Sequence, residues 1–97
     1  MREIEKAMVQ AVNARKNWKC DNTEVRNETY KMSVYLYGHK IYEESIRGGK
    51  LRMFTLAGFN TSTTRSRLRA LGIDVRQRSF EPIYYGKVIS KFSWYNA

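Results

Sequence analysis

Alternation of side chains between residues 30 and 37 is the feature that most limits the fold of this chain. Met32, Val34 and Leu36 occupy every second position, and polar or amphipathic side chains lie between them. Successive side chains of a strand point to opposite faces of a sheet, so the segment predicts a strand with one apolar face. Such a face has to be covered by a second layer of structure.

Residues 3 to 18 are predicted to supply that layer as an amphipathic helix. Their apolar side chains recur at helical spacing, at Ile4, Ala7, Met8, Ala11 and Val12. Further short strands are expected at 23–27, 40–44, 50–56, 73–78, 83–85 and 87–90. Turns are expected at Gly38-His39 and Gly48-Gly49.

A second helix is predicted between Asn60 and Gly72. Residues 60–64 offer several N-cap side chains, and Gly72 stands where a left-handed C-cap belongs. Leu68 should lie in the core, whereas Arg67 is expected at the surface. The predicted fold class is α+β, one antiparallel sheet with two helices on one face.

An internal sequence similarity, which we call the echo, relates the two halves of the chain. Residues 24–26 read Glu-Val-Arg and residues 74–76 read Asp-Val-Arg, while residues 35–41 resemble residues 83–89. The echo predicts helix-strand-strand units at 3–44 and 60–90 within a single domain over 1–97. The match is short and needs a two-residue length change, so a repeat and a chance match both stay open. The tail at 91–97 is expected to be flexible, and it either packs back on the sheet or binds a partner.

The positive charge of the chain is concentrated in its second half. The net charge is +9, of which residues 49–97 contribute +7 because only Asp74 and Glu81 oppose their nine basic side chains. A basic half of this kind attracts polyanions, which include nucleic acid, an acidic protein face and anionic lipid.

The predicted second helix and the strand after it are the strongest candidate for a binding site. Arg65 and Arg69 share one helix face, and Arg76 and Arg78 share one side of the strand. The Thr/Ser-rich first turn offers backbone N–H groups and hydroxyls to a phosphate. The predicted nucleic-acid-binding residues are Thr61, Ser62, Thr63, Arg65, Arg67, Arg69, Arg76, Arg78 and Lys87.

Two other interpretations of this helix stay open. It can be an ordinary capped helix with a solvated arginine face, or the recognition helix of a helix-turn-helix motif preceded by residues 56–60. The polar Arg67 stands where that motif needs an apolar side chain, so a lone basic helix after a strand is favoured. Tyr35 and Tyr37 alternate with the apolar positions and are candidates for exposed rings that stack on bases.

Catalytic and metal-binding patterns are scarce in the sequence. Cys20 is the only cysteine and His39 the only histidine, which excludes an internal disulfide and any site built from several of these residues. No run of residues is long and apolar enough for a membrane span or a signal peptide. We therefore predict no catalytic residue, no metal, no cofactor and no membrane contact, and a binding protein of a reducing cytoplasm in place of an enzyme.

Several blocks of the chain resemble small proteins encoded by tailed bacteriophages. These blocks are Trp18-Lys19, Asp21 to Val25, Val34 to Gly38, Leu56 to Phe59 and Thr63 to Leu68, with Phe59 where a tryptophan is expected. The resemblance implies a phage origin and the cytoplasm of an infected bacterium, and it supplies no site.

The leading functional hypothesis is a basic nucleic-acid-binding protein, with DNA favoured over RNA and duplex DNA expected. The alternative is a phage-encoded protein that binds a host protein and modulates or inhibits a defence or transcription complex during host takeover. The sequence leaves base preference, the identity of a host target and the oligomeric state open, a homodimer included.

Overall fold

The computed structural model describes residues 1–47 and 51–97, so the predicted turn at Gly48-Gly49 lies outside the described residues. In chain order the elements are α1 (Glu3–Ala14), β1 (Trp18–Cys20), β2 (Thr23–Glu28), β3 (Lys31–Leu36), β4 (His39–Ser45), β5 (Arg52–Phe54), α2 (Ser62–Ala70), β6 (Val75–Arg78), β7 (Glu81–Tyr84), β8 (Lys87–Val88) and β9 (Tyr95–Asn96).

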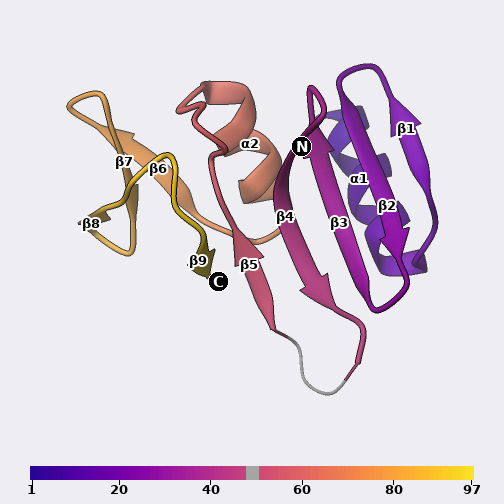
Figure 1. Cartoon of the computed structure of the whole chain (residues 1–97). Coiled ribbons are helices and arrows are strands. Elements are labelled where there is room, and N and C mark those ends of the chain that lie inside the picture. The colour runs from indigo at the N-terminus through magenta and orange to yellow at the C-terminus, as the bar shows by residue number, and fades with distance from the viewer. Residues whose placement is uncertain (48–50) are drawn as a thin grey trace.

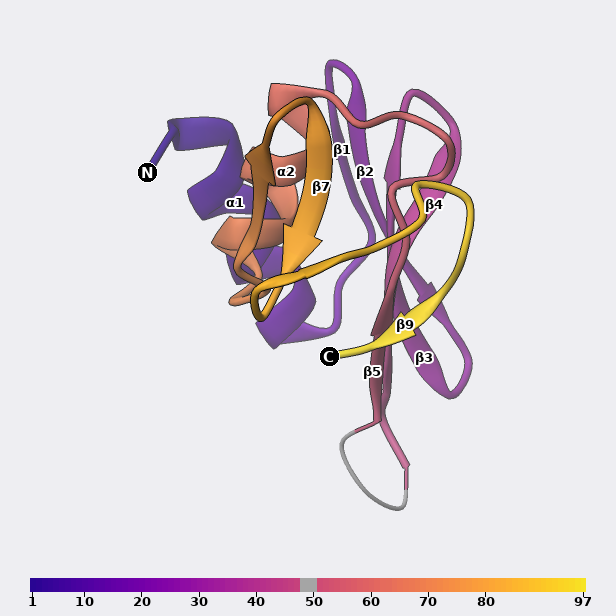
Figure 2. The ribbon, with the colours of Figure 1, turned by 90° about the vertical axis from the view of Figure 1, so that its left-hand side faces the viewer.

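A six-stranded antiparallel sheet forms one layer, in the order β1-β2-β3-β4-β5-β9. Both helices lie on the same face of this sheet, and the opposite face is open (Figures 1 and 2). The alternation in β3 has the predicted effect, because Met32, Val34 and Leu36 are buried on the helix side. The α+β fold class is confirmed.

Helix α1 is shorter than the sequence predicts. Arg15 adopts a left-handed conformation with φ 56°, and its N–H donates to the Ala11 and Val12 carbonyls, which ends the helix. Trp18 was expected inside the helix and instead begins the edge strand β1. The buried side of α1 contains Met8 and other apolar residues, and also one carboxylate, Glu5.

Strands β6, β7 and β8 form a separate three-stranded antiparallel sheet, so the prediction of one continuous sheet is wrong. The free edge of β5 is taken by β9, where Phe54 pairs with Tyr95. The small sheet therefore packs on the core through side chains. Val75 is buried, and the Tyr84 ring lies edge-on to Phe54 with centroids 4.9 Å apart.

The sequence echo falls on equivalent places in the two parts of the fold. Each helix precedes an antiparallel meander, and Val25 and Val75 are both fully buried. Tyr37-Gly38 and Tyr85-Gly86 form the same two-residue hairpin, with φ of 51° and 80° in the first and 51° and 75° in the second. Positive φ at both positions is the geometry of a type I′ turn.

The C-terminal tail packs back on the sheet through β9. The Tyr95 hydroxyl accepts a hydrogen bond from the Ser90 N–H at 2.7 Å, and the Lys91 carbonyl accepts from the Gly58 N–H at 2.7 Å. Phe92 and Trp94 remain exposed between these anchors. Packing on the sheet is thus one of the two outcomes that the sequence leaves open.

Candidate nucleic-acid interface

Helix α2 and strand β6 lie side by side and run in opposite directions. Arg69, near the end of α2, donates from Nη1 to the carbonyl of Val75 at the start of β6, at 3.0 Å. Asn60, just before α2, donates from Nδ2 to the carbonyl of Phe80, just after β6, at 3.3 Å. Nine helical residues and four strand residues each span roughly 13 Å, so the two elements match in length.

We name the four arginines Arg65, Arg69, Arg76 and Arg78 the arginine ridge. Arg69, Arg76 and Arg78 are exposed, and Arg65 is half-buried with Nη1 bonded to the Asn60 Oδ1. Burial and the charge of Arg69 lower the pKa of Arg65. Within residues 1–47 and 51–97, Arg76 is the one member held in an ion pair, 2.6 Å from Asp74. Glu81 is the cross-strand partner of Arg78, so two acids oppose the four arginines and the ridge keeps a net positive charge.

Arg67 does not belong to the ridge, and its expected surface position is wrong. The side chain is 4% exposed and forms an ion pair with Glu5, Nη1 to Oε2, at 2.8 Å. Its Nε also donates to the Thr23 hydroxyl at 3.0 Å. Arg67 points roughly 180° away from the mean direction of Arg65 and Arg69, toward α1 and β2. It cannot touch a phosphate from there.

Glu5 is the centre of a polar cluster that joins α1 to α2. Burial by itself raises the pKa of Glu5, but hydrogen bonds from Ser66 and Arg67 outweigh it and hold this pKa below its ordinary value. The Ser66 hydroxyl donates to Glu5 Oε2 at 2.6 Å. The carboxylate is therefore charged at neutral pH, and the cluster is structural.

The first turn of α2 is capped by its own side chain. Thr61 Oγ1 accepts from the Thr64 N–H at 3.2 Å and lies 2.9 Å from the Thr64 hydroxyl. The Thr61 hydroxyl is thus engaged within the helix, whereas Ser62 is exposed and Thr63 half-buried at the same end of the ridge.

Lys87 lies on the other face of the small sheet from Arg76 and Arg78. Val75, Tyr84 and Lys87 are cross-strand neighbours, whereas Arg76 pairs with Ile83 on the opposite face. The structure thus places α2, which carries Arg65 and Arg69, beside β6, which carries Arg76 and Arg78, and it puts Lys87 on the other face of the small sheet.

Tyr35 and Tyr37 differ in availability. The Tyr37 ring is 71% exposed, as expected for a stacking residue. Tyr35 is half-buried, its ring is covered by the Arg26 guanidinium at 4.0 Å, and its hydroxyl donates to Glu28 at 2.8 Å. The expectation of an exposed ring at Tyr35 is wrong.

The open face of the large sheet is covered by paired charges. Lys40 lies 3.1 Å from Glu28 and 3.8 Å from Glu43, which also pairs with Lys31 at 3.1 Å. The pKa of Glu28 is lowered to about 2. The Ser33 hydroxyl has the largest effect, and the Tyr35 hydroxyl and the Lys40 ammonium add to it. Together they outweigh desolvation, which by itself raises this pKa. This face offers little net charge to a polyanion.

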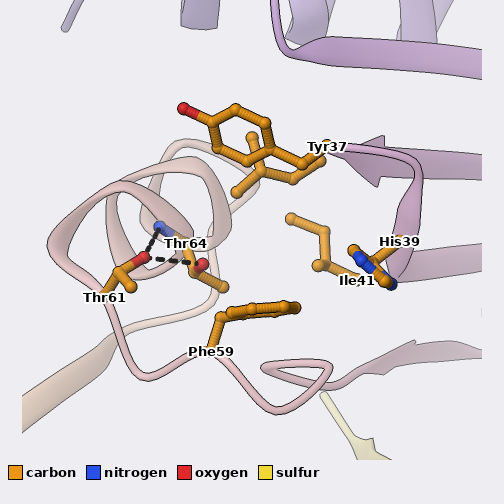
Figure 3. Close-up of a pocket in the computed structure, with 7 residues that line it drawn as sticks. Tyr37, His39, Ile41, Phe59, Thr61 and Thr64 are labelled. Atoms are coloured by element: carbon orange, nitrogen blue, oxygen red, sulfur yellow. Dashed lines mark hydrogen bonds between the residues drawn. The ribbon is translucent and has the colours of Figure 1, made fainter.

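A pocket of about 220 Å³ opens beside the start of α2 (Figure 3). Its walls come from the β3–β4 turn, from β4 and from the segment that leads into α2; the lining residues are Leu36, Tyr37, His39, Ile41, Phe59, Thr61 and Thr64. The His39 and Phe59 rings lie 5.1 Å apart. The sequence does not mark His39 and Phe59 as site residues, because each stands alone in a predicted loop.

These features define a small basic α+β protein with arginines on the adjacent elements α2 and β6 and a pocket lined by aromatic rings. The whole chain, residues 1–97, matches the family described as Kyanoviridae Gp96 protein, and the chain belongs to that family. It is thus a bacteriophage protein, as the resemblance of its sequence blocks implies. No curated protein and no solved structure matches it. Among the residues that the structure describes, neither helix has the length and apolar character needed to cross a membrane.

Proposed function

We propose that this phage protein binds nucleic acid through the arginine ridge in the cytoplasm of the infected cell, with duplex DNA its preferred target. The observation that carries the proposal is the antiparallel placement of α2 beside β6, fixed by the Arg69–Val75 and Asn60–Phe80 hydrogen bonds. That placement sets two arginines of α2 beside two arginines of β6, and Asp74 pairs with one of the four.

The dimensions of the ridge suit a phosphate backbone. A stretch of duplex roughly 13 Å long carries about four phosphates on each strand, and four guanidinium groups can meet the phosphates of one strand. Guanidinium groups bind phosphates through paired hydrogen bonds, which supports arginine over lysine at such a surface. Ser62 and Thr63 at the end of the ridge can add neutral donors to the same backbone.

The test is a titration of duplex DNA over a range of salt concentrations. Arg76→Ala with Arg78→Ala should weaken binding to all sequences alike and flatten the dependence of log Kd on log salt by about two, because each lost phosphate contact removes about 0.9 from the slope. The matched control is Lys16→Ala with Lys19→Ala, which removes the same formal charge from two exposed side chains of the first half. Binding that is unchanged between low and physiological salt contradicts the proposal.

The second candidate function is binding of a host protein, favoured by exposed aromatic rings on the small sheet. Phe80 is 90% and Tyr85 84% exposed, each in a hairpin turn, and aromatic side chains are enriched in protein interfaces. Capture of the same host protein from lysate by the parent and by the Arg76/Arg78 variant, without DNA binding by either, supports this candidate over the first.

A further inference from the structure

The pocket at the start of α2 has the shape and lining of a site for one flat ring. Figure 3 shows Tyr37 and Phe59 on opposite sides of it, with Ile41 and His39 along one wall and the Thr61 and Thr64 hydroxyls along the other. Its volume of about 220 Å³ is below the roughly 300 Å³ at which pockets for larger ligands begin. A single ring system fits, and a whole nucleotide does not.

We propose that this pocket holds one unpaired nucleobase of the bound nucleic acid, an inference that rests on the proposed function. The lining carries no acidic or basic side chain other than the imidazole of His39, so it suits an uncharged ring better than a phosphate. Base stacking on aromatic rings needs exposed rings, and Tyr37 and Phe59 are both exposed. The threonine hydroxyls bond each other and cap α2, so stacking on the rings is the interaction that holds the base.

The pocket adjoins one end of the arginine ridge. Asn60 accepts a hydrogen bond from Arg65 of the ridge and donates to the Phe80 carbonyl, while its two chain neighbours, Phe59 and Thr61, line the pocket. A strand whose phosphates lie along the ridge can therefore deliver its next base to the pocket. The base has to be unpaired to enter, so the favoured ligand is a duplex with a single-stranded overhang.

The backbone that carries the two rings at the mouth is ordered before any ligand arrives. Tyr37 lies in the positive-φ hairpin turn with Gly38, and its N–H donates to the Asn22 carbonyl at 2.8 Å. The N–H of Phe59 donates to the Leu56 carbonyl at 2.8 Å, and the Phe59 ring contacts His39. A site that is already formed loses less entropy when it binds a ring.

The experiment compares two DNA hairpins that differ only in their short overhang, which carries either normal bases or abasic sugars. Both probes have the same phosphates, so ridge contacts are equal and only the base contribution changes. We expect the probe with bases to bind roughly five- to 150-fold more tightly, the range for stacking of one base on aromatic side chains. Overhangs of both polarities are tested.

Tyr37→Ala and Phe59→Ala should each reduce the ratio of the affinities for the two probes toward one. Neither change should alter the salt dependence of binding. Tyr85→Ala is the matched control, because Tyr85 has the same turn geometry and an exposed ring but does not line the pocket. Phe59→Leu, which keeps apolar bulk without an aromatic face, should also lower the ratio and serves if Phe59→Ala fails to fold.

The outcomes separate the two proposals. If both probes bind equally tightly and this binding depends on the ridge arginines, the pocket inference is overturned and nucleic-acid binding stays intact. The pocket inference is also overturned if Tyr85→Ala lowers the affinity ratio as much as Tyr37→Ala does. Failure of the parent protein to bind any probe overturns the proposed function, and the pocket inference with it.

Discussion

Replacing Arg67 with alanine should destabilise the protein by about 3 to 5 kcal/mol. The two side chains of the Glu5–Arg67 pair are each 4% exposed, and the substitution leaves the Glu5 carboxylate buried without its cation. Breaking a buried ion pair from one side has this cost because the remaining charge has lost both its partner and its water. The Ser66 hydroxyl remains beside Glu5 and offsets only part of the loss.

Urea and thermal unfolding measure this change. For a domain of this size, 3 to 5 kcal/mol lowers Tm by roughly 12 to 40 °C. The control Arg78→Ala, on an exposed side chain, should stay within about 0.5 kcal/mol of the parent. The double change Glu5→Leu with Arg67→Met removes both charges and keeps apolar volume, so it should recover most of the lost stability.

Two results would refute this reasoning. If Arg67→Ala unfolds at the same urea concentration as Arg78→Ala, the ion pair does not hold α1 against α2. If the double variant is no more stable than Arg67→Ala, the cost arises from lost packing or hydrogen bonds and not from an unpaired charge.

Two further predictions concern the same fold. Thr61→Ala should cost about 0.5 to 2 kcal/mol in urea unfolding, because it removes the side-chain cap of α2, and Thr61→Ser should retain most of that stability. The free energy of unfolding should fall in acid, because the pKa of Glu28 in the folded protein is about 2, against an ordinary value of 4.5. The stabilisation that ionised Glu28 contributes is complete above pH 4.5 and is lost as the pH falls toward 2. Glu28→Gln should flatten part of this decline in unfolding experiments across that range, and an unchanged profile would contradict the assignment.

Local patterns predicted the elements of this fold well. The alternation in β3 set which side chains are buried, and the cap residues around Thr61 and the glycine at position 72, with φ 88°, correctly bounded α2. These signals act over a few residues, so a single sequence contains them in full.

Contacts between distant segments were beyond the reach of such patterns. Arg67 faces inward because Glu5, 62 residues earlier, supplies its counter-charge, and neither residue has an apolar signature that marks it as buried. The same holds for the pocket, whose Tyr37 and Phe59 belong to separate loops that only the folded chain brings together. The division into two sheets likewise depends on β9, which occupies the edge of β5.

The lengths of the outermost strands have a consequence for how copies of this protein behave toward one another. The large sheet ends in β1, three residues long, on one side and in β9, two residues long, on the other. A neighbouring chain that tried to extend the sheet could form only a few backbone hydrogen bonds at either end, and at β1 it would meet the exposed Lys19. Two short edges, one of them carrying a lysine, discourage the edge-to-edge pairing between copies that leads to aggregation.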